Sequence, residues 1–439
     1  MIEIHEYDNI RLVVIILLTL VSFLWVSRVS EYRVKVWYAL VAFFIFIYSG
    51  VGGAIEEVKS EYVFYYAIYI VTLSLTLYFF NKKRNKEKNR IGQEKTDYIV
   101  ERFIDNNGAF FIILYFFLLL LDLAYPTFRL DLLISPPSPS LEDLHYNNFV
   151  VGNTKDGVSQ LIYLLQQFVN PFFYLSLYKY RKNYKIVLIL LLFPVYIDLC
   201  NRGIIGRGES MIPFIIVFIS LLEKLKPKNR KRLIIVSAVA IPFVCYAAVQ
   251  FSFIRIGAGT VNISLTDSVQ MIFGQEVAYP LHFNEYIGRG QAVSILDYIL
   301  WIVLLPVPGF LKFGYGDPQI NLMFTQMITG MDPTQMGFSI CLPGLVGESI
   351  IVFGPLLFPV HAIIVGIIIS VLIKYLSKCK SYEYLFYFAT IIFSYSICRG
   401  GTSSAYSFAF KQFLVLVVFI YLLKKNRKYK MAPNIFANN

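Results

Sequence analysis

The sequence predicts an all-α polytopic membrane protein with about eleven membrane-spanning helices. Of its 439 residues, 57% are hydrophobic and only 15% are charged, whereas a soluble domain has about 25% charged residues. Apolar runs long enough to cross a hydrocarbon core of about 30 Å recur from end to end. Because these runs are continuous and not alternating, they favour helices, which satisfy their own backbone hydrogen bonds in lipid.

The predicted spans start close to the amino terminus, and the first lacks the basic segment and small-residue cleavage site of a signal peptide. The spans lie at 11–27, 37–54, 62–80, 108–125, 159–178, 186–200, 210–222, 233–251, 349–373, 383–398 and 405–423. They divide the chain into an amino-terminal bundle of eight spans (1–251), an external loop region (252–348) and a carboxyl-terminal bundle of three spans (349–439).

The loops between the spans fall into two classes that alternate strictly along the chain. The loops at 28–35, 81–102, 179–185, 223–232, 374–383 and 424–430 carry a net charge of +22, and the other six carry −9. Basic loops remain in the cytoplasm, so the amino terminus is predicted outside and the carboxyl terminus inside. The overall charge of +12 is therefore interpreted as a topology signal and not as a nucleic-acid surface.

The external loop region is the longest stretch without a clear membrane-spanning helix, and we expect it to form the external half of a membrane-embedded active site. The alternation of the loops requires an even number of crossings within it. Its own apolar run, from Ile295 to Leu305, is short and ends at Pro306. This run predicts a re-entrant or interfacial helix, with a hairpin of two short spans as the alternative.

Five arginines lie at the ends of predicted spans or in the external region, on the predicted outer side of the membrane. Four have an adjacent glycine, and Arg255 has one two residues later. Arginine offers a fork of donors that matches phosphate oxygens, and glycine lets the backbone approach a ligand closely. The pattern predicts a diphosphate site formed by Arg202, Arg207, Arg255, Arg289 and Arg399. Contacts with lipid headgroups or external carboxylates are the alternative for any single arginine.

A transfer reaction at such a site needs a group that accepts a proton. Glu348 is the first candidate, because a carboxylate at the mouth of the ninth span would be partly desolvated, which favours proton acceptance near neutral pH. Its alternative role is to pair with an arginine. Glu276 and His282 are the next candidates, although a lone histidine is more often structural. His361 and Lys411 lie inside predicted spans, where an ionisable group is a functional suspect.

Several signatures of other enzyme classes are missing from the sequence. It has no Asp-x-Asp pair for a metal–nucleotide clamp, no phosphate-binding loop of ATPases and no Gly-x-Ser-x-Gly turn. Its five cysteines form no Cys-x-x-Cys pair, so neither a zinc site nor a disulfide framework is indicated. The sequence thus predicts chemistry without a cofactor and without a metal.

The order of motifs resembles that of the O-antigen polymerase (Wzy) family, which polymerises bacterial oligosaccharide repeat units. The resemblance covers about residues 195–400, while the amino-terminal spans match only in being hydrophobic. In order, the motifs are Arg-Gly-x-x-Gly-Arg (202–207), Arg255, Gly-Gln (274–275), Gly-Arg-Gly (288–290), Pro-x-Pro (306–308), Gly-Phe-Ser (337–339), Gly-Glu (347–348) and Phe-Gly-Pro (353–355).

The resemblance implies a membrane glycosyltransferase with the largely helical GT-C fold in the bacterial inner membrane. Its donor and acceptor would be repeat units linked to undecaprenyl diphosphate at the periplasmic face, and a chain-length regulator (a polysaccharide co-polymerase) would be a partner. The product would be an O-antigen or a capsular-type polysaccharide. The energy lies in the diphosphate bond, so no nucleotide motif is required.

Two other readings of the sequence stay open. An O-antigen ligase would use the same donor but transfer the finished glycan to the lipid A core. A flippase for the lipid-linked unit would tend to show inverted repeats and charges near the membrane midplane, and the sequence shows no repeat.

Overall fold

The structure is a computed structural model that describes residues 6–27, 32–81, 90–125, 130–136, 157–202, 207–255, 262–265, 268, 278–283, 293–305, 307, 318–332, 335, 340–400 and 402–425. Within these ranges the regular elements are helices, with one isolated β-bridge between Tyr7 and Ile55. The prediction of an all-helical chain is confirmed for this part of the molecule.

In the described part of the chain, seven helical segments are long and apolar enough to cross a membrane. They are α1 (Asn9–Ser27); α2 (Tyr32–Ile45) with η1 (Phe46–Gly50) and η2 (Val51–Ala54); α3 (Glu61–Asn81); α4 (Arg90–Ala124); α7 (Tyr184–Arg202); α15 (Gly344–Leu376); and the end of α17 (Thr402–Ser407) with η10 (Phe408–Phe413) and α18 (Leu414–Lys425). The chain is therefore a helical, membrane-embedded protein.

The four remaining predicted spans also coincide with helices. These are α6 (Gly157–Ser176), α8 (Arg207–Lys224), α9 (Pro227–Arg255) and α16 (Glu383–Ile392), which η9 (Phe393–Ile397) continues. Whether all four cross the membrane is not decided by their length and composition, so the total of eleven spans stays a prediction.

Helix α4 starts earlier than the sequence analysis placed it. The span was predicted at 108–125, but the helix begins at Arg90, so part of the expected loop 81–102 is helical. This extension is amphipathic, because Ile99, Val100, Phe103 and Ile104 are buried on one face while Glu101 and Asp105 are not. A helix with one apolar stripe can continue out of the membrane against neighbouring elements.

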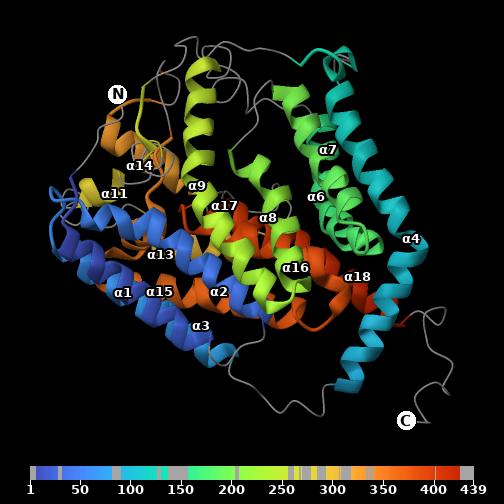
Figure 1. Cartoon of the computed structure of the whole chain (residues 1–439), viewed down its shortest axis with the longest axis horizontal. Helices are drawn as coiled ribbons and strands as arrows, with labels where there is room; N and C mark the ends of the chain where they lie inside the picture. Colours follow the sequence, from blue (N-terminus) through green and yellow to red (C-terminus); the bar gives the residue numbers. More distant parts are fainter. Residues whose placement is uncertain are drawn as a thin grey trace.

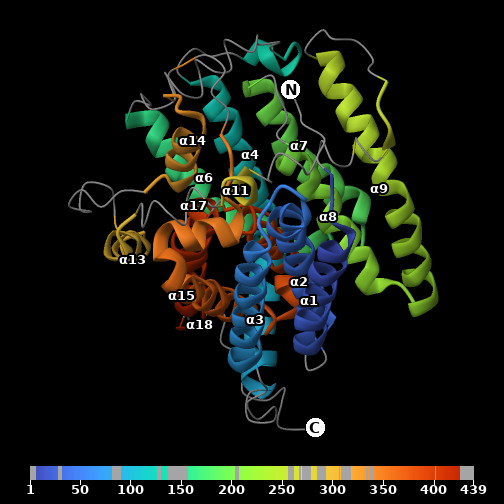
Figure 2. The same ribbon diagram turned by 90° about the vertical axis from the view of Figure 1, so that its left-hand side faces the viewer.

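Helix α15 packs along α3 and also contacts η1 and α16. Figure 1 shows the amino-terminal helices α1–α3 beside α15, with α4, α6 and α7 forming a second group across the molecule. Helix α9 stands at the edge (Figure 2). Ile235, Val239 and Phe243 of this helix are more than half exposed, as expected for a face that meets lipid.

The described residues of the external region include three short helices, α11 (Ala278–Leu281), α13 (Ile295–Val303) and α14 (Ile320–Thr329). Helix α13 has nine residues and rises only about 13 Å, so it is too short to cross a membrane. Its Tyr298 and Trp301 are buried, whereas Leu296 and Val303 are more than 60% exposed. The short helix predicted for this run is therefore present, and an exposed apolar face suits a re-entrant or interfacial position.

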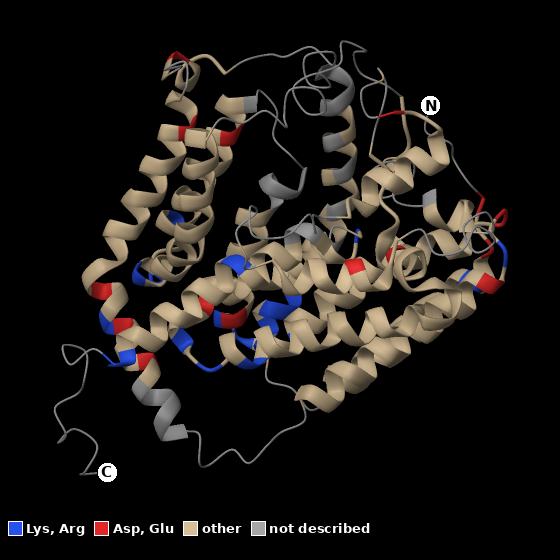
Figure 3. Cartoon of the chain, turned by 180° about the vertical axis from the view of Figure 1, so that it is seen from behind, with Lys and Arg blue, Asp and Glu red and all other residues tan. Residues whose placement is uncertain are grey.

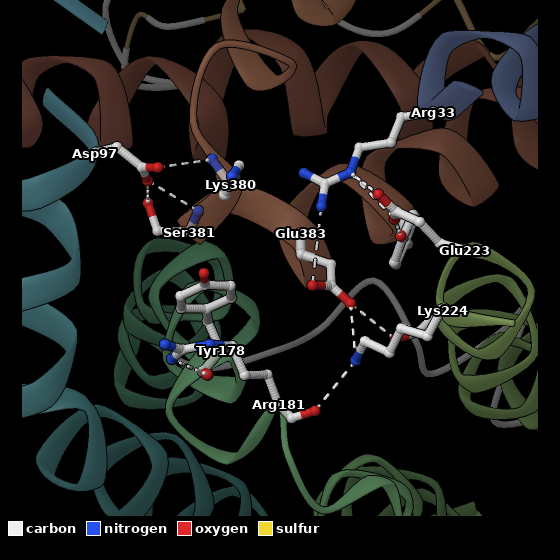
Figure 4. Close-up of polar contacts among 11 residues, drawn as sticks. Arg33, Asp97, Tyr178, Arg181, Glu223, Lys224, Lys380, Ser381 and Glu383 are labelled. Carbon is white, nitrogen blue, oxygen red and sulfur yellow. Dashed lines mark hydrogen bonds and ion pairs between the residues drawn. The ribbon is translucent and has the colours of Figure 1, made fainter. Parts of the chain in front are cut away.

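The contacts at one end of the molecule join five of the six loops that the sequence assigns to the cytoplasm. In Figure 3 the blue Lys and Arg segments gather mainly toward the lower left, and Figure 4 shows the network. Arg33 pairs with Glu223 at 2.8 Å, and Lys224 reaches both Glu383 (3.3 Å) and the carbonyl oxygen of Arg181 (3.1 Å). Asp97 accepts bonds from Ser381 and the backbone N–H of Lys380. We call this set of residues the basic end.

The contacts at the opposite end join loops of the other class. Glu56 donates its N–H to the carbonyl oxygen of Glu6 (3.1 Å), which joins the loops 1–9 and 55–61. Arg11, at the start of the first span, donates to the carbonyl oxygen of Val58 (2.6 Å). The described contacts thus join loops within each class, as strict alternation requires. Which end faces the cytoplasm stays a prediction.

Candidate functional site

Three backbone segments cross at the start of α15. Gly344 donates its N–H to the carbonyl oxygen of Arg399 (3.2 Å). A Cβ on Gly344 would lie 2.7 Å from the carbonyl oxygen of Tyr48, and one on Gly400 would lie 3.1 Å from the nitrogen of Gly344. Both glycines have positive φ, +66° and +85°, which side chains disfavour. The crossing therefore depends on glycine at both positions.

Irregular helix turns surround this crossing. Segments η1 and η9, which supply Tyr48 and the turn before Arg399, are both π-helical. A π-helical turn holds one extra residue and is frequently found at functional sites. Their concentration here indicates that the local backbone is shaped for something other than packing alone.

Glu348 lies one turn further along α15 and is fully buried, with 0% of its surface exposed. Its Oε1 accepts a hydrogen bond from Thr402 Oγ1 (2.5 Å) and a longer one from the hydroxyl of Tyr298 (3.4 Å). The prediction of partial burial at the mouth of a span is therefore wrong. Helix α15 begins at Gly344, five residues before the predicted start at 349, so Glu348 lies inside it and beneath α13 and α17.

A chain of buried hydroxyl and imidazole groups continues from Tyr298 into the bundle. Tyr298 lies 3.0 Å from Nε2 of His361 and 3.5 Å from the hydroxyl of Tyr406, and Tyr69 lies 3.0 Å from Nδ1 of His361. Tyr69 belongs to α3, so His361 bonds to a neighbouring helix. All of these side chains are 0% exposed.

The break in α15 at Gly354 explains how Glu348 and His361 reach the same hydroxyl. Thirteen residues of regular helix would place them about 140° apart around the axis, on different faces. Gly354 has non-helical angles, φ 71° and ψ 174°, and Pro355 follows it. The break changes the direction of the second half of the helix, and both Glu348 and His361 lie within hydrogen-bonding distance of the Tyr298 hydroxyl.

Arg399 lies beside the crossing and is half-buried. Its Nη1 bonds to the hydroxyl of Tyr395, and its guanidinium carbon lies 4.9 Å from the ring centre of Tyr395 and 5.6 Å from that of Tyr48. Aromatic faces attract a cation and hold it in place. The structure thus brings Arg399 and Glu348, which the sequence analysis selected separately, to the same end of α15.

The structure describes the other predicted site residues only in part. Arg202 and Arg255 are the last residues of α7 and α9, and Arg207 is the first of α8, but their side chains lie outside the described part of the structure. Arg289 and Glu276 lie outside the described residues altogether. The convergence of five arginines is therefore still a prediction.

His282 follows α11 directly and is half-buried. Helix α11 packs on the start of α15 through Tyr279, so closely that a Cβ on Gly347 would lie 2.5 Å from the ring. The hydrogen bonds described for Glu348 nevertheless come from Thr402 and Tyr298. Lys411, the other suspect inside a span, lies in η10 and is half-buried.

The partners of Glu348 were missed by the sequence analysis. Thr402 follows Arg399 closely, and a hydroxyl in the motif after that arginine was the one available signal. Tyr298 is one of 32 tyrosines in the chain and lies in an apolar run, so nothing in the sequence distinguished it. The arrangement joins a carboxylate that accepts hydrogen bonds to a nearby arginine, and it can accept a proton and bind an anion at one place.

Comparison of the chain with protein families, with curated proteins and with solved structures gives no match. The functional interpretation therefore rests on the residues and on the motif order described above.

Proposed function

We propose that the chain is a membrane glycosyltransferase that polymerises oligosaccharide repeat units linked to undecaprenyl diphosphate. The observation that carries the proposal is that Glu348 and Arg399 lie at the same end of α15, where Thr402 bonds to Glu348 and the backbone carbonyl oxygen of Arg399 accepts the N–H of Gly344. A carboxylate and an arginine at one place are what a transfer from a lipid diphosphate to a sugar hydroxyl needs. The motif order of 195–400 supports the same reaction.

In this reaction the acceptor hydroxyl attacks the anomeric carbon of the growing glycan, and the bond from that carbon to the diphosphate oxygen breaks. The hydroxyl proton passes to Glu348, and the electron pair of the broken bond stays on the departing diphosphate. Arg399, held on the Tyr48 and Tyr395 rings, stabilises that charge as it develops. Because Glu348 is fully buried in this conformation, the proton passes to it through the Thr402 hydroxyl or after the Thr402 side chain moves away.

The proposal includes a GT-C arrangement of eleven spans in the bacterial inner membrane. The basic end then faces the cytoplasm, because basic segments remain on that side, and the start of α15 faces the periplasm, where lipid-linked units are presented. A chain-length regulator is the proposed protein partner, and no metal takes part.

Deleting the gene for this protein in its host tests the proposed function. The measurement is the banding pattern of the surface glycan. Polymerase activity predicts a ladder that collapses to the core plus one repeat, and restoration by the wild-type chain. Loss of all repeats from lipid A, with polymer still linked to undecaprenyl diphosphate, would instead identify a ligase. Accumulation of single lipid-linked units on the cytoplasmic side would identify a flippase.

A further inference from the structure

The buried groups around His361 form a line that runs through three helices. It starts at Tyr69 on α3, passes through His361 on α15 and Tyr298 on α13, and ends at Glu348 on α15, with links of 3.0, 3.0 and 3.4 Å. Because every member is fully buried, each donor in the line has to find its acceptor within the protein.

The donors and acceptors of this line can be assigned from their chemistry. An ionised carboxylate only accepts hydrogen bonds, a tyrosine hydroxyl has one proton to donate, and a neutral imidazole has one donor and one acceptor nitrogen. Bonds to a charged acceptor are about twice as strong as neutral ones, so Tyr298 donates its proton to Glu348. Its oxygen then accepts from Nε2–H of His361, and Nδ1 of His361 accepts from Tyr69.

We propose that Tyr298 and His361 are positioning residues for Glu348, joined to it in a hydrogen-bond relay that runs from Tyr69 through His361 and Tyr298 to the carboxylate. The proposal rests on the proposed function in one respect, namely that Glu348 is ionised in order to accept a proton. The relay fixes His361 as the Nε2–H tautomer and orients the Tyr298 hydroxyl toward Oε1.

The relay also makes the carboxylate dependent on the external region. Tyr298 belongs to α13, which is held against α15 by packing of Tyr298 on Phe353 (ring centres 5.8 Å apart) and against α17 by packing of Trp301 on Tyr406 (6.0 Å). The Tyr298–Glu348 bond therefore forms only when α13 is seated against α15 and α17, so the position of α13 helps to orient the candidate base.

The tautomer of His361 can be measured without any assay of activity. The chain has four histidines, His5, His145, His282 and His361, so a protein labelled with ¹⁵N-histidine gives few signals, and His361→Gln identifies the one of interest. The relay predicts a neutral imidazole protonated at Nε2. We expect its nitrogen signals to shift in Tyr298→Phe and in Tyr69→Phe.

Tyr66→Phe is the matched control for both substitutions. Tyr66 lies on α3 three residues before Tyr69 and is equally buried, but its hydroxyl bonds to Thr19 at 2.7 Å. We expect the His361 signals to stay unchanged in this variant. A neutral imidazole protonated at Nδ1, a charged imidazolium, or signals that fail to respond to Tyr298→Phe would overturn the relay.

Measuring the turnover of purified variants shows whether Tyr298 and His361 position Glu348 or only pack around it. Loss of one hydrogen bond to the carboxylate in Tyr298→Phe should lower turnover roughly 10-fold to 100-fold and leave the KM for the lipid-linked donor unchanged. His361→Gln, which keeps one donor and one acceptor, should recover most of the turnover that His361→Leu loses. A Tyr298→Phe variant with wild-type turnover would overturn the positioning role. A wild-type protein without turnover would count against the proposed function alone, since the nitrogen signals still decide the relay.

Discussion

Gly344 and Arg399 are joined by a backbone hydrogen bond of 3.2 Å between residues 55 positions apart in the sequence. The bond holds the start of α15 next to the turn that follows η9. Thr402, three residues after Arg399, is thereby placed where it can bond to Glu348. The geometry of the candidate site is therefore determined by a glycine crossing, and substitutions at that crossing should affect function before they affect the rest of the fold.

We expect Gly344→Ala to lower both the unfolding temperature and the turnover. The added Cβ would meet the carbonyl oxygen of Tyr48 at 2.7 Å, in addition to the strain of about 1–2 kcal/mol that positive φ imposes on a side chain. Gly330→Ala is the matched control, because Gly330 has the same φ of +67° but an added Cβ would have nothing within 4 Å. Thermal unfolding in detergent measures both. Equal losses in the two variants would show that the crossing is not tightly packed.

The positions of the helices could be predicted from the sequence because continuous apolar runs carry that information directly. The start of α15 could not be predicted, because Pro343 and the two glycines in 344–347 are residues typical of a loop. The partners of Glu348 could not be predicted either. Tyr298 and Thr402 lie 50 and 54 residues from Glu348 in the sequence, and no spacing rule connects groups that only tertiary packing brings together.

The salt-bridge network at the basic end should contribute measurably to stability. Arg33→Met would leave Glu223 without its guanidinium partner in a largely buried place, since the two side chains are 17% and 27% exposed. We expect a loss of about 2–3 kcal/mol in the free energy of unfolding. Arg181→Met serves as the control, because the Arg181–Glu101 pair is about one third exposed and should cost about 1 kcal/mol. A smaller loss for Arg33→Met than for the control would contradict the network.

Cysteine labelling in intact cells tests which end faces the cytoplasm. Lys228 and Gln335 are both exposed, and we place Lys228 in the cytoplasm and Gln335 outside. An impermeant maleimide should label Gln335→Cys and spare Lys228→Cys, which only a permeant reagent should reach. Labelling of both positions by the impermeant reagent would contradict the topology.

Native Cys379 provides an internal control when the other four cysteines are replaced by serine. It is 1% exposed, and burial raises the pKa of its thiol to about 12. It should therefore stay unlabelled until the protein is unfolded.

Arg399→Lys should abolish most activity while membrane insertion stays normal. A lysine keeps the charge but loses the planar fork that lies on Tyr48 and Tyr395 and that suits a diphosphate, and loss of a buried charged hydrogen bond costs about 2–5 kcal/mol. Arg11→Lys is the control, because Arg11 lies at the same end but bonds to Asp8 and Val58. Wild-type ladders from both variants would mean that Arg399 serves folding or lipid contact.

The most direct test of the account is the turnover of purified Glu348→Gln with a lipid-diphosphate-linked repeat unit. The amide keeps the size of the carboxylate and one acceptor oxygen but cannot accept a proton at neutral pH. Glu383→Gln is the control, because Glu383 is 5% exposed but belongs to the basic end; it should reduce stability and leave the turnover of the folded protein intact. The account predicts that Glu348→Gln lowers turnover about 10²–10⁴-fold with unchanged donor affinity. Wild-type turnover in a folded Glu348→Gln protein would contradict it.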